Sequence, residues 1–500
     1  MSNISYTERK AAWFAERSLR RHAGVFHLWA LGVGAVISGD FFGWNFGFLA
    51  GGFGGLMAAL LIMTVLYICL CSSVAELSAA LPHAGGAYSF ARASMGPWGG
   101  YVTGLAENME YIFTPATIVV GVGGYLGAIF GTPASYEPLW WLACYLVFLV
   151  LNVWGVEMSF RVSAVTTVSA LAVLAVFYAG AIPHFDLRHW AIGQRALLPF
   201  GVAGIFASLP FALWVYLGIE QLPLAAEETH NPERDMPRGI FWALATLIVC
   251  SLATPVLSGS IAPGAEAVGK SSEPLFLGFQ AIFGSGIRTR LLALFAVTGL
   301  IASFHAIIYA YGRQIYSLAR AGYFPAWLSG THGTRHTPHR ALVSGSALGF
   351  GAAVAIRLSG PAGPVGAILL NMAVFGAVLA YILQMASFML LRKNAPHLAR
   401  PFVSPLGTAG AATAALLAAV TLGALFLNPD YRIGVVGAAV WFALGVAYFA
   451  VYARHRLILA PEEEFALNLE RASDESVTHS VPAIHPDPEH DEPPAAEATA

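Results

Sequence analysis

The sequence predicts an all-α integral membrane protein with twelve transmembrane helices, arranged as a five-plus-five inverted repeat in which helices one and six are discontinuous. Hydrophobic residues make up 57% of the 500 residues and charged residues only 11%, whereas an average soluble domain carries about 25% charged residues. Apolar runs recur along most of the chain, and two of them are interrupted by glycines and acids. An ordinary soluble enzyme is therefore disfavoured.

The membrane spans follow from the length of the apolar runs. As a helix, about 20 apolar residues cross a hydrocarbon core of roughly 30 Å. We expect spans at about 25–47, 51–80, 98–130, 138–155, 160–182, 198–225, 239–261, 289–318, 341–358, 364–391, 406–427 and 433–454. A short apolar piece near 274–284 is expected on the outer surface. The first run is too long for the apolar core of a signal peptide, so we expect no cleavable signal.

The charges are divided unevenly along the chain, whose total is −2. Residues 461–500 hold 11 of the 28 acids and one of the 26 bases, which leaves residues 1–460 with 25 bases and 17 acids. With the N-terminus inside, 19 bases fall in inner segments and 7 in outer loops. The positive-inside rule then predicts that both termini are cytoplasmic.

These patterns divide the chain into three parts. We expect a cytoplasmic N-terminal segment at 1–24, a transporter domain at 25–455 and an acidic cytoplasmic tail at 456–500. Within the domain the repeats cover about 25–182 and 198–391, and two further helices follow. The tail from Pro461 onward is rich in Pro, Ala and acids and lacks apolar residues to bury, so we expect it to be disordered.

The four cysteines lie inside apolar segments, without metal-ligand spacing or a disulfide framework: Cys69, Cys71, Cys144 and Cys250. We expect them to be small buried residues, and we expect neither a metal site nor a cofactor.

The first span makes a poor continuous helix. Between residues 32 and 45 it holds four glycines together with Ser38, Asp40 and Asn45. A glycine costs about 1 kcal/mol in a helix interior, and a charge at mid-membrane costs at least about 2.5 kcal/mol. Freed backbone groups are tolerated there only where they face protein or a water-filled cavity. The run Ile37–Asp40, which includes Gly39, is therefore predicted to be unwound and to line a site.

The sixth span carries a second break of the same kind, with Pro210, Gly218 and Glu220. The offset of five spans predicts an inverted repeat with the site between two discontinuous helices. Glycines that only allow close helix packing are the alternative. Packing does not explain the intramembrane acids Asp40 and Glu220.

Three stretches resemble signatures of the amino acid–polyamine–organocation transporter superfamily. They read Glu76-Leu-Ser-Ala-Ala-Leu-Pro82-His-Ala-Gly85-Gly86-Ala-Tyr88, Ala226-Glu227-Glu228-Thr-His-Asn231-Pro232-Glu-Arg234-Asp-Met-Pro237-Arg238 and Tyr316-Ser-Leu-Ala-Arg320-Ala-Gly322-Tyr-Phe-Pro325. Within it, bacterial ethanolamine permeases are the closest resemblance. That resemblance rests on Ser38-Gly39-Asp40-Phe-Phe-Gly43-Trp44-Asn45-Phe-Gly47, and on Gly96-Pro97-Trp98-Gly99-Gly100 leading to Thr103-Gly-Leu-Ala-Glu107-Asn-Met-Glu110-Tyr111-Ile-Phe-Thr114-Pro115-Ala116.

The superfamily resemblance covers about residues 20–455, and the narrower one rests mainly on spans one and three. Together they imply a secondary transporter of the bacterial inner (plasma) membrane that imports a small amino alcohol by alternating access. The implied partners are a small cationic amine and the lipid bilayer, with no nucleic acid.

Moving ethanolamine requires an anion or an aromatic face for its ammonium and a polar partner for its hydroxyl. An amino-acid site instead needs positive helix ends and N–H groups for the substrate carboxylate. By resemblance, Asp40 stands where the superfamily has a glycine. A carboxylate there repels an α-carboxylate and attracts an ammonium, so this departure favours an amine.

Span three places Glu107, Glu110 and Tyr111 on one helical face with Thr103 and Thr114. Two carboxylates three residues apart are not expected to be ionised together in a low-dielectric interior. By resemblance, Glu110 lies at a substrate-side position and is our candidate for the ammonium. Glu107, nearer the cytoplasm, is the candidate for a proton or a gate. The alternative is a structural pair bonded to a neighbouring helix, or Glu107 paired with a cytoplasmic Arg.

Aromatic residues flank the second break. By resemblance, Trp214 is the aromatic that closes over substrate, and with Tyr216 it also suits an ammonium. Core packing is the alternative for Trp214. Glu220 matches a glutamate of the superfamily that gates or titrates rather than touching substrate.

Energy coupling has weaker signals in the sequence. Sodium-coupled relatives place span-eight hydroxyls near the span-one carbonyls, and Ser303 is available there. Proton-coupled relatives place a lysine in span five, which here contains none. This leaves uniport, exchange or a proton carried by a carboxylate. His305 is a further titratable candidate, or a buried histidine with satisfied hydrogen bonds.

Three rival interpretations remain. An amino-acid or polyamine permease of the same fold is the first. A membrane-embedded enzyme needs a catalytic constellation, and the histidines of the loop, His332, His336 and His339, have no acid or cysteine nearby in sequence. A transporter-like sensor would need an output domain, which nothing in the tail resembles.

Overall fold

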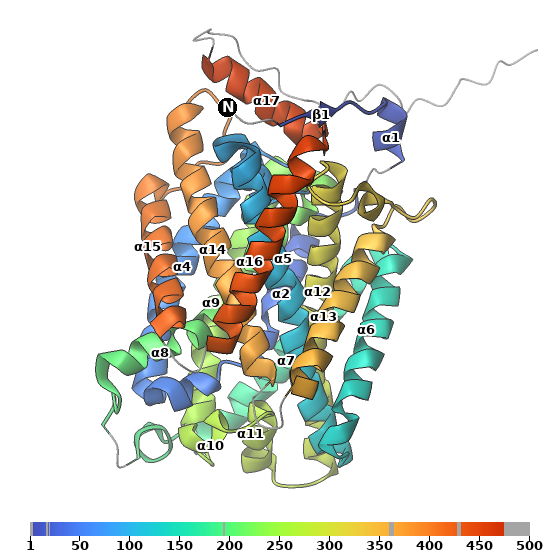
Figure 1. Ribbon diagram of the computed structural model, residues 1–500. Helices are drawn as coiled ribbons and strands as arrows, with labels where there is room; N and C mark the ends of the chain where they lie inside the picture. Colours follow the sequence, from blue (N-terminus) through green and yellow to red (C-terminus); the bar gives the residue numbers. More distant parts are fainter. Residues whose placement is uncertain are drawn as a thin grey trace, which may run out of the picture.

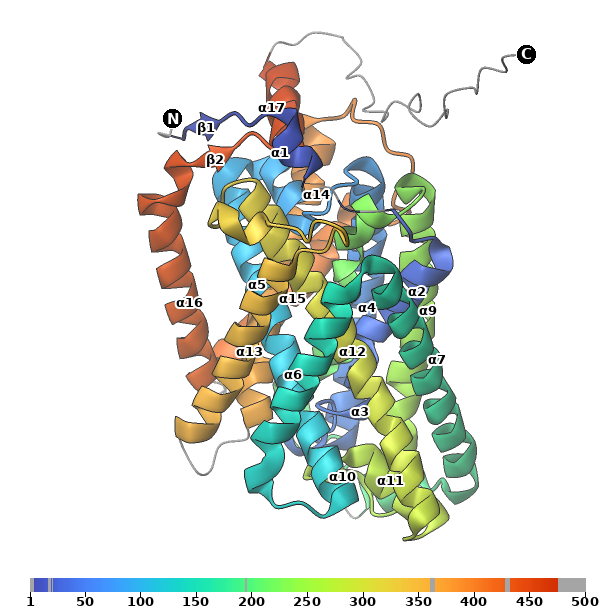
Figure 2. The same cartoon turned by 90° about the vertical axis from the view of Figure 1, so that its right-hand side faces the viewer.

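The twelve expected spans all correspond to helical segments in the computed structural model, which describes residues 4–16, 19, 21–193, 196–359, 365–427 and 432–474. Long helices run side by side along one axis of the molecule (Figures 1 and 2). Eleven helices in the described part of the chain are long and apolar enough to cross a membrane. The first span is made of two shorter helices, α2 and α3, between Val25 and Phe41. The all-helical membrane fold is thus confirmed.

The spans have the following bounds: α2 Val25–Val36, α3 Ser38–Phe41, α4 Phe46–Ala80, α5 Ala87–Phe130, α6 Glu137–Trp154, α7 Val156–Ala181, α8 Gly201–Trp214, α9 Pro232–Gly259, α12 Ile287–Arg320, α13 His339–Ser359, α14 Val365–Asn394, α15 Gly407–Leu427 and α16 Arg432–Val451. A 3₁₀ helix, η4 (Ile219–Glu228), continues the sixth span after α8. Two short helices, α10 (Ala265–Gly269) and α11 (Pro274–Phe283), lie together at one end of the bundle (Figure 1).

The broken helices lie inside the bundle. Helix α5, most of whose residues are buried, packs against α12 and α14, while α2 packs against α7, α9 and α12. Helix α4 packs against α8 and α9. By contrast, α6 and α16 expose apolar side chains such as Leu139, Leu146 and Leu444. The apolar exterior therefore surrounds an interior in which polar groups can be buried.

Both described ends of the chain meet at the opposite end of the bundle from α10 and α11 (Figures 1 and 2). Strand β1 (Tyr6–Thr7) pairs in parallel with β2 (Leu457–Ile458), and helix α17 (Pro461–Asp474) follows. The remaining short helices are α1 Ala11–Ala15, η1 Ala134–Tyr136, η2 Ile182–His184, η3 Leu187–Ile192, η5 Ala326–Ser329 and η7 Ala453–His455. We call the end formed by β1, β2, α17 and the η4–α9 connection the terminal face.

The structure corrects the expected tail at its beginning. The sequence favoured disorder from Pro461, but residues 461–474 form α17, and its first turn is docked on the bundle. Glu462 and Glu463 are buried there against arginines of α5 and α12. Burial of these acids depends on partners far away in the sequence, so the local composition gave no sign of it. Residues 475–500 lie outside the described residues.

Candidate functional site

The first break interrupts the span at Ile37, between α2 and α3. The prediction that Ile37–Asp40 is unwound was wrong in its extent, because Ser38–Phe41 forms α3 and the extended backbone begins only at Phe42. Ser303 of α12 bridges it, because its Oγ accepts a hydrogen bond from Ser38 N at 2.8 Å and donates to Gly34 O at 2.7 Å. On the other side, Tyr125 Oη donates to Phe41 O at 2.9 Å. Side chains from α5 and α12 thus satisfy backbone groups that the interrupted helix leaves free, as buried backbone requires.

The second break follows Trp214, the last residue of α8. Gly218 has φ 109°, a left-handed conformation that favours glycine. Its N–H lies 3.1 Å from both Oε atoms of Glu220. Glu220 is thereby held against the start of η4, where the positive end of a helix stabilises a carboxylate. The backbone N–H of Gly218, two residues earlier, therefore fixes the position of the Glu220 carboxylate in the break.

The two breaks are in direct contact. A Cβ added to Gly39 would lie 2.7 Å from Val215 Cα, so only glycine permits this approach. Trp214 Nε1 donates to Phe42 O at 2.9 Å, and this buried indole links the end of α8 to the residue that follows α3. Ser38, Gly39, Trp214 and Gly218 were all predicted to line one site, and the structure brings them together.

Three predicted acids gather beside the breaks. Glu107, Glu110 and Glu220 are almost completely buried. Glu107 is hydrogen-bonded, with Gln314 Nε2 at 2.5 Å and Tyr111 Oη at 3.4 Å. Glu110 lies next to Glu220, but in the described residues no hydrogen-bond donor reaches either of its carboxylate oxygens. We call Glu107, Glu110 and Glu220 the carboxylate cluster.

Tyrosines line the cluster on the side of α4 and α14. Tyr67 Oη and Tyr381 Oη are 3.0 Å apart, and both tyrosines lie close to Glu110 and Glu220. Tyr216 stacks at a tilt on Tyr67, with ring centroids 5.0 Å apart, and shares a hydrogen bond of 2.7 Å with Thr64. The aromatic faces and hydroxyls near the acids suit a small cation that also carries a hydroxyl.

Asp40 has different neighbours from the carboxylate cluster. It is fully buried in α3 beside Thr254 of α9, whose hydroxyl shares a 2.7 Å hydrogen bond with Tyr178 of α7. Tyr216 and Cys250 are also close to it. In the described part of the chain neither Asp40 oxygen has a hydrogen-bond partner. The site thus contains two separate places where a buried carboxylate lacks a donor.

The coupling candidate His305 is fixed by hydrogen bonds on both sides of its ring. His305 makes hydrogen bonds through both ring nitrogens, with Nδ1 3.0 Å from Asn152 Nδ2 and Nε2 3.1 Å from Ser159 O. This geometry favours the structural interpretation of His305. Among the described residues, no group of three or more His, Cys, Asp or Glu side chains could hold a metal ion.

Sequence reasoning missed several residues around the acids. Gln314 and Thr254 are polar residues within apolar spans, and that signal was available in the sequence. Tyr67, Tyr178 and Tyr381 had no such signal, because tyrosine is common in apolar helices and its neighbours come from other spans.

Charged residues of the three signature stretches form ion pairs at the terminal face. Arg320 contacts Glu227 at 2.7 Å and Glu462 at 3.0 Å, and Arg313 contacts Glu228 at 2.9 Å. Glu76 of the first stretch contacts both Arg392 (2.5 Å) and Arg400 (3.2 Å). Outside the three stretches, Arg92 contacts Glu463 at 2.6 Å. Burial raises the pKa of Glu463, and the Arg92 guanidinium only partly offsets this effect.

Comparison with known proteins gives a family for this architecture. Residues 27–468 match the family described as amino acid permease. An uncharacterized transporter of Rhizobium meliloti is 34% identical over 337 residues, which cover 65% of this chain and 70% of that protein.

Relatives with named substrates match over most of their length. A branched-chain amino acid permease of Bacillus subtilis is 26% identical over 89% of this chain and 95% of its own. A methylthioribose transporter of the same organism is 25% identical over 90% of this chain and 97% of its own. These relatives are named as permeases or transporters, and none of them as an enzyme.

Proposed function

Because this chain belongs to the amino acid permease family, we propose that it is a secondary transporter that imports ethanolamine, a small cationic amine, by alternating access. It is a multi-pass membrane transporter and not an enzyme. Its relatives are named for an amino acid in one case and for methylthioribose in another, so family membership leaves the substrate open.

The observation that carries the proposal is the carboxylate of Glu110. It is fully buried beside the two breaks, and none of the described residues donates a hydrogen bond to it. An uncompensated buried carboxylate costs several kcal/mol. A bound ammonium would remove this cost by supplying a positive charge and N–H donors. Tyr67 and Tyr381 are suitable partners for the hydroxyl of the substrate.

Asp40 supports an amine over an amino acid. Its unpartnered carboxylate lies in the first turn of α3, next to the first break, where the N-terminal end of that helix would otherwise offer its positive end to a substrate carboxylate. A negative charge there repels that group. We infer that Asp40 sets the preference for substrates that lack a carboxylate.

The proximity of Glu110 and Glu220 suggests how charge is balanced without substrate. Two adjacent buried acids share a proton more easily than they hold two charges. Arrival of the ammonium would allow that proton to leave, which couples amine entry to proton release or to exchange. Glu107, held by Gln314 and Tyr111, is a positioning residue in this scheme, and Ser303 holds the first break.

An amino-acid substrate is the second candidate, and the names of the relatives favour it. A D-serine/D-alanine/glycine transporter of Escherichia coli (strain K12) is 23% identical over 87% of this chain. In that case, the N–H groups of Ser38 and Gly218 would exchange their present acceptors, Ser303 and Glu220, for the substrate carboxylate, and Glu110 would bind its ammonium.

Uptake of labelled ethanolamine into proteoliposomes, with and without a pH gradient, tests the proposal. Choline, putrescine, alanine and leucine serve as competitors. We expect unlabelled ethanolamine to compete and the two amino acids not to. Absence of ethanolamine uptake, together with uptake of labelled alanine or leucine by the same proteoliposomes, would replace the amine with an amino acid.

The orientation belongs to the same proposal. We propose that the terminal face lies on the cytoplasmic side of a bacterial inner membrane, and the excess of bases in the inner segments supports this orientation. Protease added outside intact cells should then leave the segment 457–474 uncut.

A further inference from the structure

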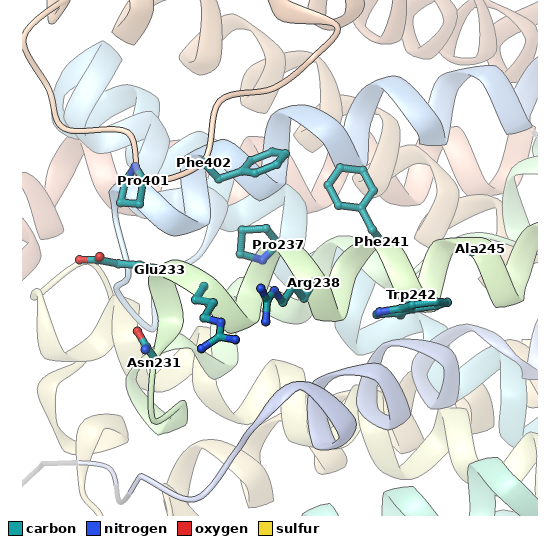
Figure 3. Close-up of a pocket in the computed structure, with 10 residues that line it drawn as sticks. Asn231, Glu233, Pro237, Arg238, Phe241, Trp242, Ala245, Pro401 and Phe402 are labelled. Carbon is teal, nitrogen blue, oxygen red and sulfur yellow. The ribbon is translucent and has the colours of Figure 1, made fainter.

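A groove lies outside the transport site, at the start of α9 on the terminal face (Figure 3). It has a volume of about 770 Å³ and runs between the first turns of α9 and the chain at Pro401 and Phe402. Helix α9 is one of the membrane-spanning helices. The groove therefore lies where the helix passes from the surface of the membrane into its interior.

The inner part of the groove is apolar and aromatic. Phe241 and Phe402 pack with ring centroids 5.6 Å apart, and Trp242 is 65% exposed. Exposed tryptophans are frequent at the boundary between headgroups and hydrocarbon. Ala245 lies one turn further along α9 and also lines the groove.

The outer part of the groove carries two arginines. Arg234 and Arg238 are four residues apart on α9, so they lie on one face of the helix, and both are exposed. Within the described ranges neither side chain makes a hydrogen bond or an ion pair. The nearby acid of the groove, Glu233, directs its carboxylate away from Arg238 (Figure 3).

We propose that this groove is a binding site for one anionic phospholipid of the adjacent leaflet. Arg234 and Arg238 bind the phosphate, for which guanidinium groups have matching geometry, and an acyl chain lies over Trp242 and Phe402. The combination of two unpaired cations and an aromatic wall complements a molecule that is anionic at one end and apolar at the other. Basic pockets at the cytoplasmic ends of membrane helices bind lipid headgroups in this way.

Native mass spectrometry of the full-length protein, titrated with phosphatidylglycerol or phosphatidylcholine, tests this proposal. We expect the wild type to retain phosphatidylglycerol preferentially. The double variant Arg234→Gln/Arg238→Gln should bind it roughly tenfold or more weakly, since hydrogen bonds to charged groups are lost. Trp242→Ala should weaken binding of both lipids.

The double variant Arg454→Gln/Arg456→Gln is the matched control. It removes one half-buried cation, Arg454, and one exposed cation, Arg456, from the same end of the molecule, outside the groove, and should bind phosphatidylglycerol like the wild type. Equal loss in both double variants would show a general charge effect and overturn the proposal. Unchanged binding in Arg234→Gln/Arg238→Gln would overturn it as well. Displacement of the lipid by millimolar inorganic phosphate would identify a free-anion site instead.

Discussion

Glu110 in α5 and Glu228 at the end of η4 are both completely buried, but their surroundings are opposite. Glu228 contacts Arg313 at 2.9 Å and accepts a hydrogen bond from Tyr309. Glu110 has no donor among the described residues and faces a second acid, Glu220. A buried charge is stable when it is paired and costly when it is not. The comparison indicates that Glu228 and its partners at the terminal face hold the fold, whereas Glu110 beside the breaks awaits a ligand or a proton.

The largest expected effect comes from breaking the pair at the terminal face. Arg313→Met leaves Glu228 buried without its cation, which costs about 3–5 kcal/mol for a pair of this kind. Thermal unfolding in detergent should show this loss directly. The double variant Arg313→Met/Glu228→Gln should recover a large part of it, since it removes both charges. If the double variant were as unstable as the single one, pairing would not explain the stability of this face.

The opposite result is expected beside the breaks. Glu110→Gln removes a charge that no residue of the described chain compensates, so it should leave stability unchanged or higher. Ethanolamine affinity should fall roughly 10- to 100-fold, because a hydrogen bond to a charged group is worth about 1.5–3 kcal/mol. Binding measured by calorimetry and unfolding measured on the same samples separate the two effects.

Glu107→Gln is the matched control for this variant. Glu107 lies one turn away and already has Gln314 and Tyr111 as partners. Its replacement should change ethanolamine affinity less than that of Glu110. Unchanged affinity in Glu110→Gln would move the ammonium partner to Asp40 or Glu220.

The docking of α17 extends the comparison to the tail. Glu463 contacts Arg92 at 2.6 Å and accepts a hydrogen bond from Tyr323 at 2.8 Å. Glu463→Gln should raise hydrogen exchange in residues 461–474 roughly tenfold, while the transmembrane helices keep their protection, because α17 can leave the bundle by itself. Glu464→Gln, at the exposed neighbouring position, should have no effect. Equal exchange in both variants would mean that α17 is held by its apolar contacts alone.

The sequence allowed the spans, the interruptions of spans one and six and the buried acids to be predicted, because each has a local signal: an apolar run, clustered glycines or a charge inside the membrane. It did not predict that Ser38–Phe41 is helical and that the extended backbone begins at Phe42. Partners across the bundle had no local signal. Nothing near Asp40 in the sequence points to Thr254 or Tyr178, and nothing near Pro461 points to Arg92 or Arg320. Such contacts depend on how α3, α7, α9 and α17 pack, and this packing is specified by side chains distant along the chain.

The smallest expected effect separates the contribution of burial to stability from that of ion pairing. Lys270 contacts Glu266 at 2.9 Å, the same separation as Arg313 and Glu228, but the side chains of the first pair are 63% and 53% exposed and those of the second are fully buried. Exposed i,i+4 pairs contribute about 0.3–0.5 kcal/mol. Lys270→Ala should therefore change stability by no more than about this amount, measured as for Arg313→Met. A loss of several kcal/mol in Lys270→Ala would show that distance and not burial governs these pairs. A small loss would show that burial determines how much an ion pair contributes to stability. Burial then explains both why Glu228 depends on Arg313 at the terminal face and why Glu110, which has no partner beside the breaks, is costly.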